Sequence, residues 1–138
     1  MSIGLVTFSL GRREYATPLT SVREIVRLHG LADLPGMAAP LAGVLDLRGT
    51  ALPVLDLRPG DGAGGDVLVL EQPSGGPVGV AVDHVRAVVR DHDLPPTSTA
   101  ERGVLPDYVI DVLRGPDGIV FLVDLPAMLD AARVPAPA

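Results

Sequence analysis

Short apolar runs separated by glycine and proline dominate this sequence. The runs between these residues are mostly about 4 to 8 residues long, a length typical of β-strands. We predict strands at Gly4–Leu10, Glu14–Thr17, Glu24–Leu28, Leu41–Leu47, Ala51–Leu57, Val67–Glu71, Val78–Val82, Val85–Arg90, Val109–Leu113 and Ile119–Val123. The pattern therefore predicts a mostly-β fold.

Helix is expected only in short pieces. The segment Pro126–Arg133 begins with a proline, which the first turn of a helix tolerates. Met128, Leu129 and Ala132 would lie on one side of that helix. A single helical turn is also expected at Thr20–Arg23, where hydroxyl side chains can cap it.

Two segments of the chain occur twice. SVREIVR at Ser21–Arg27 is similar to HVRAVVR at His84–Arg90, and VLDLRGTALPVLDL from Val44 is similar to VIDVLRGPDGIVFLVDL from Val109. The same order and nearly the same spacing indicate a duplicated unit of four or five strands. A small antiparallel sheet must close or find a partner to bury its edges and apolar face. Two barrels of this kind, packed side by side, would satisfy both needs, so the repeat predicts a pair of packed barrels.

The chain length is that of a single domain, residues 1–138. The glycine-rich segment 58–66 divides it nearly in half, so the approximate subdomains are 10–64 and 65–134, and the N-terminal strand can pack on either. A long irregular loop is expected at 92–107.

The core is expected to be aliphatic, because only 3% of the residues are aromatic and none is Trp. The expected core positions include Leu55, Val120 and Leu122.

Composition excludes several classes of function. A net charge of −6 argues against nucleic acid as a partner. The absence of cysteine excludes disulfides, thiolate zinc sites and a cysteine nucleophile. No apolar stretch approaches the ~18 residues that span a bilayer, and the N-terminal run lacks a basic leader. We expect a cytoplasmic protein that does not insert into membranes.

Candidate chemistry is sparse. His29, His84 and His92 lack the spacing of metal ligands. GDGAGGD at Gly60–Asp66 lacks the lysine and hydroxyl of a phosphate-binding loop and the acidic ladder of a calcium loop. The carboxylates of Asp91 and Asp93 are expected in an open polar loop. General acid–base catalysis needs surroundings that move the pKa values of two such groups apart, and an open loop does not provide them. No metal, cofactor or catalytic residue is predicted, and a small β-barrel enzyme is the least favoured alternative.

The central segment GVLDLRGTALPVLDLR, Gly43–Arg58, resembles the signature of the CheW-like chemotaxis coupling proteins. The segment Val6–Val26 is similar to the opening of that family, and LPG at Leu34–Gly36 to the part before the signature. VGVAVDHVRAVV at Val78–Val89 is similar to the second-half strand pair of the family, and FLVDLPAML, residues 121–129, to its closing strand and helix.

This resemblance implies two packed five-stranded SH3-like barrels with a short C-terminal helix. It also implies a non-catalytic adaptor that couples the cytoplasmic tip of chemoreceptors to the regulatory domain of the histidine kinase CheA, at membrane-associated receptor arrays. An alternative is the same scaffold serving a kinase array for motility or development. The genome neighbourhood, or the partners that the protein retains in a pull-down, would distinguish these two roles.

By resemblance, the receptor-contact positions are Val22, Glu24, Gly43 and Arg48, around the groove between the barrels. The kinase-contact positions lie at a barrel end, near Asp56, Leu57 and Arg58.

Arg48 itself has two interpretations. It can be solvated at its Gly turn, or it can face a partner, since arginine is enriched at binding hot spots. Position 46 is Asp where the family usually has Asn. Asp46 is two residues from Arg48 and is expected to pair with it across one strand face.

Overall fold

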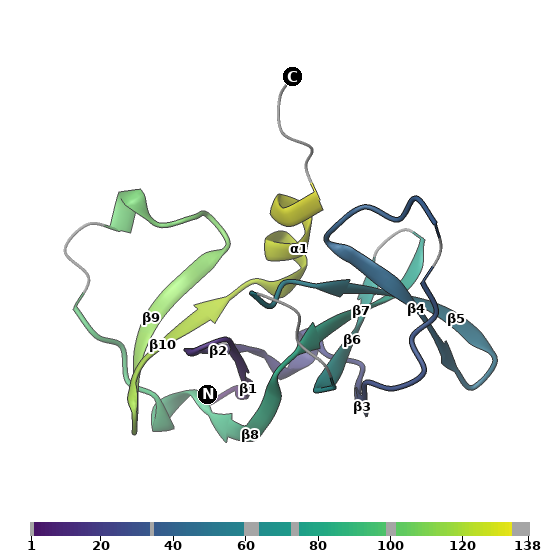
Figure 1. The fold of residues 1–138 in the computed structure, drawn as a ribbon. Coiled ribbons are helices and arrows are strands. Elements are labelled where there is room, and N and C mark those ends of the chain that lie inside the picture. The colour runs from purple at the N-terminus through teal and green to yellow at the C-terminus, as the bar shows by residue number, and fades with distance from the viewer. Residues whose placement is uncertain (1, 34, 60–63, 73–74, 99–101, 134–138) are drawn as a thin grey trace.

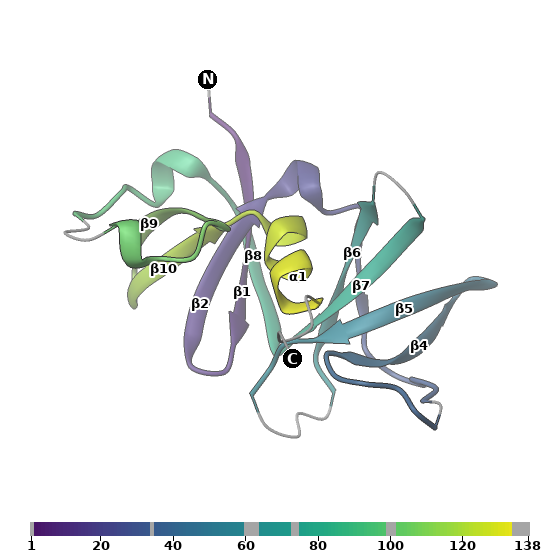
Figure 2. The same cartoon turned by 90° about the horizontal axis from the view of Figure 1, so that it is seen from above.

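The computed structural model describes residues 2–33, 35–59, 64–72, 75–98 and 102–133. Within these residues the chain forms two five-stranded sheets and one α-helix, which confirms the expected fold class (Figure 1). The two sheets lie side by side, and the helix lies over the junction between them (Figure 2). The C-terminal VPAPA segment lies outside the described residues, as does part of the glycine-rich connector.

All predicted strands are present, with ends within two residues of those expected. The strands are β1 (Gly4–Leu10), β2 (Arg13–Pro18), β3 (Glu24–Arg27), β4 (Leu41–Leu47), β5 (Thr50–Asp56), β6 (Asp66–Gln72), β7 (Gly76–Val82), β8 (His84–Arg90), β9 (Val109–Gly115) and β10 (Gly118–Val123). The helix α1 spans Leu125–Arg133. Short 3₁₀ turns occupy Leu19–Ser21, Asp91–Asp93 and Arg102–Val104.

The two sheets repeat one topology. One sheet has the order β8-β1-β2-β10-β9, and the other has the order β3-β6-β7-β5-β4. In each sheet the pairs are antiparallel, antiparallel, parallel and antiparallel along that order. We call the first the terminal barrel, because it contains both ends of the chain, and the second the middle barrel.

The topology corrects the expected subdomain boundary. The middle barrel is the continuous segment from β3 to β7, whereas the terminal barrel joins β1 and β2 to β8, β9 and β10. The duplicated segments are consecutive in sequence, yet the first two strands of each copy pair with the last three strands of the other. A division at 64 and 65 therefore cuts through the middle barrel.

A single-residue link explains why β7 and β8 belong to different barrels. Only Asp83 separates Val82 from His84. An antiparallel hairpin usually needs two loop residues, and a parallel connection needs a dozen or more. β8 therefore cannot fold back into the sheet of β7, and it pairs with β1 instead.

Each barrel is closed by an isolated bridge. The bridge joins the segment after β3 or β8, the strand at one end of the sheet order, to β4 or β9, the strand at the other end. In the middle barrel Ala32 and Val44 exchange two backbone hydrogen bonds, of 2.9 and 2.7 Å. In the terminal barrel Pro96 bridges to Leu113. Because the segment after β3 or β8 covers the edge of β4 or β9, neither of these edges is left open along its whole length.

The interiors of the barrels are filled by aliphatic side chains, as the composition predicts. The buried set in the middle barrel is Leu45, Leu47, Leu52, Val54, Val67, Val69 and Ala81. The set in the terminal barrel is Leu5, Ala16, Leu94, Leu113 and Val120. Leu122 is only half-buried against this second set, so its expected place in the core is only partly correct.

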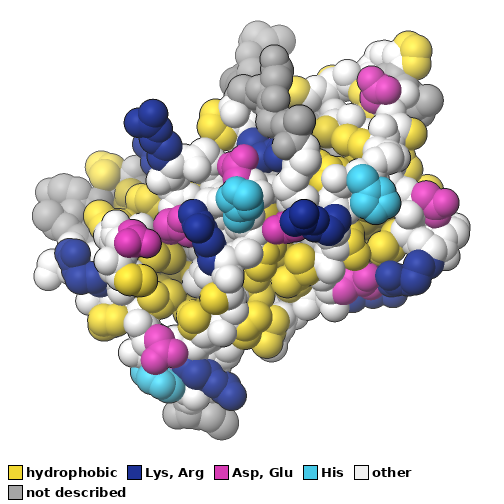
Figure 3. All heavy atoms as spheres, turned by 60° about the horizontal axis from the view of Figure 1, so that its bottom comes forward, with side chains coloured by type: hydrophobic (Ala, Val, Ile, Leu, Met, Phe, Trp, Pro, Cys, Tyr) yellow, Lys and Arg dark blue, Asp and Glu magenta, His cyan; other side chains and the backbone are white. Residues whose placement is uncertain are grey.

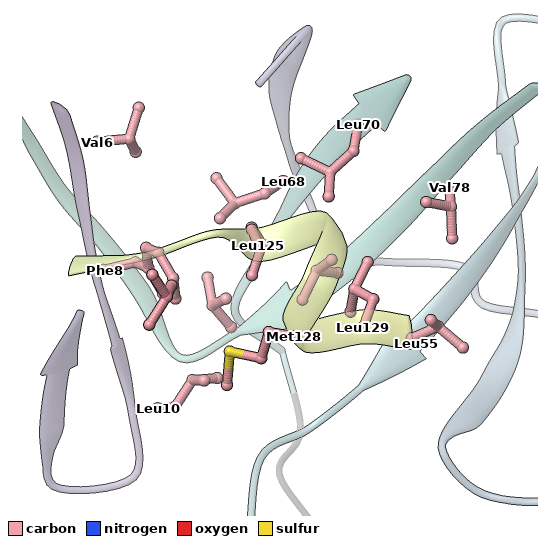
Figure 4. Packing of buried hydrophobic residues seen from close by; sticks show 13 residues of the cluster. Val6, Phe8, Leu10, Leu55, Leu68, Leu70, Val78, Leu125, Met128 and Leu129 are labelled. Carbon is pink, nitrogen blue, oxygen red and sulfur yellow. The ribbon is translucent and has the colours of Figure 1, made fainter. Parts of the chain in front are cut away.

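A third and larger cluster lies between the barrels (Figure 4). We call it the central cluster: Val6, Phe8, Leu10, Leu55, Leu68, Leu70, Val78, Val80, Val82, Val123, Leu125, Met128 and Leu129. The α1 helix contributes its apolar side, and the Asp124 side chain accepts a hydrogen bond from the Ala127 backbone at 3.2 Å to cap it. Ala132, expected on the apolar side, is exposed.

Candidate functional site

The β4–β5 hairpin ends in a tight turn made by Arg48 and Gly49. Leu47 pairs with Thr50, and the two turn residues have φ values of 50° and 87°. Two positive φ values are the requirement of a type I′ turn, which suits the twist of a hairpin. Arg48 is the only non-glycine residue with positive φ in the described part of the chain, and such a conformation is costly without a compensating interaction.

Arg48 finds that interaction in Glu24. Its Nη2 donates to both carboxylate oxygens of Glu24, at 2.9 and 2.7 Å. The hydrogen bond from Arg48 is the main reason why the pKa of Glu24 lies below its ordinary value, and the same bond raises the pKa of Arg48. The guanidinium therefore already holds a carboxylate of its own barrel, while 67% of the Arg48 side chain stays exposed.

The expected pair between Asp46 and Arg48 is not formed. The Asp46 side chain instead accepts a hydrogen bond from the Gly49 backbone N–H, at 2.8 Å. The left-handed turn directs the Arg48 side chain toward β3, and Asp46 stabilises the backbone of the turn. An asparagine at position 46 can accept the same hydrogen bond through its side-chain oxygen.

Gly43 is buried, and it lies where the barrel closes. A Cβ at this position would lie 2.6 Å from the Ala32 carbonyl oxygen and 2.7 Å from Cγ of Leu31. The absence of a side chain therefore permits Leu31 and Ala32, which we call the closing segment, to approach β4 closely. Gly43 offers no side chain to a partner, and it positions the segment that completes the barrel.

Val22 lies at the junction of the barrels. Its half-buried side chain packs against the central cluster, directly after the 3₁₀ turn Leu19–Ser21. That turn replaces the helical turn expected at Thr20–Arg23. Leu19 lines an open groove of about 420 Å³ together with Gly4, Val88, Val89, Arg90 and Asp93. We call it the β8 groove.

Three aliphatic side chains are exposed on this side of the molecule, and two of them, Ile25 and Val88, lie opposite Leu68 and Val6 of the central cluster in their sheets. They are Leu19 and Ile25, each 40% exposed, and Val88, 56% exposed. Figure 3 turns this side, which carries β3 and β8, toward the viewer and shows hydrophobic side chains gathered between charged ones. We call this surface the inter-barrel face. The sequence resemblance did not indicate Leu19 or Val88, although Val88 is the repeat counterpart of Ile25.

Asp56, Leu57 and Arg58 lie at the other end of β5. The Arg58 side chain is only 2% exposed and donates to both Asp56 oxygens, at 3.0 and 2.9 Å, and to the Gly64 carbonyl, at 2.6 Å. The hydrogen bond to Asp56 is the main reason why the pKa of Arg58 is raised. Leu57 packs against the central cluster. This group joins the end of β5 to the segment before β6, and the Arg58 guanidinium is occupied within the protein.

The structure thus brings Glu24 and Arg48 into direct contact and places Gly43 in the same barrel. Val22 faces the central cluster instead, and the Asp56–Arg58 group lies at the opposite end of β5 from the Arg48 turn. Among the described residues, no group of three His, Asp or Glu side chains is arranged to hold a metal ion. No described helix has the length and hydropathy needed to cross a membrane.

The chain matches the CheW-like domain model over residues 4–133. It is 28% identical to a probable chemotaxis protein CheW of Rhizobium etli, covering 90% of this chain and 85% of the other. It is 27% identical to the chemotaxis protein CheW of Rhizobium meliloti, covering 88% and 83%. The scaffolding protein TtCheW from Thermoanaerobacter tengcongensis has the same fold, with a TM-score of 0.71 at 22% identity over 91% of this chain and 86% of the other. The chain belongs to the CheW-like family.

Proposed function

We propose that this protein is a non-catalytic adaptor that couples chemoreceptors to the histidine kinase CheA. The observation that carries the proposal is the inter-barrel face, where Leu19, Ile25 and Val88 are exposed. Ile25 and Val88 lie opposite Leu68 and Val6, two residues of the central cluster. Exposed aliphatic side chains grouped beside a groove are typical of a protein-binding surface. The relatives named as chemotaxis proteins CheW support the signalling context.

The receptor contact is proposed for this face. A helix that enters a groove presents apolar side chains three and four residues apart. Val22 supports the face from inside the molecule, and the Glu24–Arg48 pair lies at the tip of the adjoining barrel. Because Arg48 already holds Glu24, a receptor carboxylate would have to share the guanidinium or displace Glu24.

The kinase contact is proposed for the barrel end at Asp56–Arg58. Arg58 is buried in its own ion pair, so its part in that contact is to hold the strand end in place. A partner would meet the more exposed groups around it. Such adaptor contacts are individually weak, below about 1,200 Å² of buried surface, and gain strength from many copies in an array. We place the protein in the cytoplasm, at receptor arrays.

Affinity purification from the native cell tests the proposal. We expect the tagged protein to retain a CheA-type kinase and chemoreceptors together. Retention of a kinase without chemoreceptors would indicate a kinase array with another output. Retention of neither would overturn the proposal.

Reconstitution adds a functional measurement. Receptor, kinase and this protein are mixed, and kinase activity is followed with and without the receptor stimulus. We expect stimulus-dependent kinase activity only when the adaptor is present. Equal activity without the adaptor would contradict the coupling role.

A further inference from the structure

The four aromatic residues of the chain all lie on the terminal barrel or directly beside it. They are Phe8, Tyr15, Tyr108 and Phe121. The ring centroids of Phe8 and Tyr15 are 5.7 Å apart, and those of Tyr15 and Phe121 are 5.8 Å apart. Phe8 is buried, whereas Tyr15 and Phe121 are only half-buried. These three rings form a row that crosses β1, β2 and β10 on the outer face of the sheet, the face that carries α1 (Figure 2).

A second row lies beside the aromatic row on the same face of the sheet. Arg13 is two residues before Tyr15, so the two side chains share this face, and Ile119 is related to Phe121 in the same way. The parallel register of β10 with β2 places Ile119 next to Arg13, and on its other side Ile119 pairs with Arg114 of β9. Ile119 is 51% exposed, and both arginines are exposed. We call the group of Arg13, Tyr15, Arg114, Ile119 and Phe121 the β10 surface.

The two arginines of the β10 surface form no ion pair with a described residue. Arg114 makes one long hydrogen bond, of 3.4 Å, to the Thr97 hydroxyl. Glu14 is next to Arg13 in the sequence, but it faces the other side of the strand and pairs with Arg86 at 3.2 Å. Two such guanidinium groups beside apolar side chains, in a protein of net charge −6, favour an acidic partner at this surface.

The Tyr15 hydroxyl adds a third donor. Burial is the main reason why the pKa of Tyr15 is raised, while the charge of Arg13 lowers this pKa and Tyr108 raises it. Arg13 is therefore close enough to act on the hydroxyl. No described residue accepts a hydrogen bond from this hydroxyl, although tyrosine hydroxyls that are removed from water usually have a partner. A carboxylate held by Arg13 would supply that acceptor.

The middle barrel has no equivalent of the β10 surface. Matching the strand registers of the two sheets gives the counterparts of Arg13, Ile119 and Arg114 as Gly76, Ala51 and Asp46. The counterparts of Tyr15 and Phe121 are Val78 and Pro53. Because the same topology forms without these residues, the barrel itself does not require the arginines or the aromatic rings.

The spacing of the two arginines selects the conformation of the partner segment. Arg13 and Arg114 lie on β2 and β9, two strand spacings apart, so their backbones are about 10 Å apart. In an α-helix, residues seven apart lie on one face and are separated by about 10.5 Å, with positions three and four between them on that face. In an extended segment a distance of about 10 Å corresponds to three residues, whose side chains point to opposite faces. The spacing therefore fits a helix that crosses the strands.

We propose that the β10 surface binds an acidic amphipathic helix of a partner protein, which lies across β2, β10 and β9. Two carboxylates seven residues apart on the helix pair with Arg13 and Arg114, and aliphatic side chains between them contact Ile119 and Phe121. The Tyr15 hydroxyl donates to the carboxylate at Arg13. This contact is additional to the receptor and kinase contacts proposed above, because it uses neither the inter-barrel face nor the end of β5.

The test uses a designed peptide as the probe. It is an alanine-based helix with blocked ends that carries Glu at positions i and i+7 and Leu at i+3 and i+4. Titration into the isotope-labelled protein, followed by NMR, should give saturable shifts of the Tyr15, Ile119 and Phe121 amides. A peptide with Lys in place of both Glu residues should not bind, and one with Glu at i and i+4 should bind more weakly. Equal binding of the i+4 peptide would overturn the proposed crossing geometry.

Substitutions in the protein complete the test. We expect Arg13→Glu, Arg114→Glu and Ile119→Asp each to lower the affinity for the Glu peptide at least about tenfold, a typical hot-spot effect. The controls are Arg27→Glu, at a side chain 82% exposed on β3, and Ile3→Asp, at a residue 48% exposed before β1. Both should bind like the unmutated protein.

The double variant Arg13→Glu, Arg114→Glu should bind the Lys peptide instead of the Glu peptide. Absence of binding by the unmutated protein would overturn the inference, and so would equal affinity of the three β10-surface variants and the controls. Circular dichroism of all variants checks that the fold is retained.

Discussion

Arg48 and Glu24 form an ion pair between the two ends of one sheet. Glu24 lies on β3 and Arg48 follows β4, and these strands occupy opposite edges of the order β3-β6-β7-β5-β4. The 2.7 Å contact therefore joins the ends of the sheet and supports the closure made by the Ala32–Val44 bridge. The charge that the sequence marked for a partner also contributes to the structure of the barrel.

Removing this pair should change partner binding more than stability, because exposed ion pairs contribute little to folding. Arg48→Glu places two carboxylates together, and we expect a folded protein that loses receptor-dependent control of the kinase. Arg48→Gln and Glu24→Gln serve as uncharged controls. Thermal unfolding and the reconstituted kinase assay measure the two effects separately. An Arg48→Glu protein that still couples would show that this guanidinium is not a partner contact.

The ion pair should persist in mild acid. The pKa of Glu24 is lowered by the hydrogen bond from Arg48, so the carboxylate stays ionised below its ordinary titration range. A lowered folded pKa means that the stabilisation is fully present above the unfolded value and is lost as pH falls through the folded value. Carboxyl carbon shifts from NMR titration should show this late protonation of Glu24. An ordinary Glu pKa at this position would contradict the bond.

Gly43→Ala should destabilise the protein through the closing segment. The new Cβ would meet the Ala32 carbonyl and the Leu31 side chain, and overpacking of this kind typically costs about 1–3 kcal/mol. Gly103→Ala is the matched control, because no atom lies within 4 Å of the new Cβ there. Denaturant unfolding measures both. Equal stability of the two variants would mean that the closing segment moves without cost.

Leu55→Ala and Leu122→Ala should differ in their cost to stability. Leu55 is 4% exposed within the central cluster, so its truncation should cost about 2–5 kcal/mol. Leu122 is only half-buried, and its truncation should cost less than about 2 kcal/mol on the same scale. Chemical denaturation gives both values. A larger loss for Leu122→Ala would show that the terminal barrel depends on it more than its burial suggests.

Arg58→Ala should unfold the strand end it holds. Removing one partner of a fully buried pair costs about 3–5 kcal/mol, and we expect roughly 2–3 kcal/mol here because Asp56 is still 24% exposed. The double variant Arg58→Ala, Asp56→Ala should recover part of the loss, since no carboxylate is left unpaired. Unfolding of both variants, followed by a kinase pull-down of the folded fraction, separates structure from binding. A fully stable Arg58→Ala protein that no longer binds kinase would assign the guanidinium to the interface instead.

The local patterns in the sequence determined the strands and the hairpin turn. Apolar runs between glycine and proline located every strand of the described residues, because strand formation depends on short-range hydrophobic pattern and turn chemistry. The repeat of SVREIVR and VLDLRG also correctly indicated two units of the same topology. The resemblance at Gly43–Arg58 identified the family, since that segment carries a specific series of residues.

The pairing of strands into barrels and the contacts between charges depend on the three-dimensional fold. Strands of the two copies have equivalent edges, so local pattern cannot distinguish pairing within a copy from pairing across copies; the single-residue link at Asp83 forces the exchange. The partner of Arg48 is equally non-local, because the positive φ of the turn directs its side chain away from Asp46 and toward Glu24, 24 residues earlier in the chain. Burial of Gly43 and Arg58 likewise depends on segments that meet only when the barrel closes.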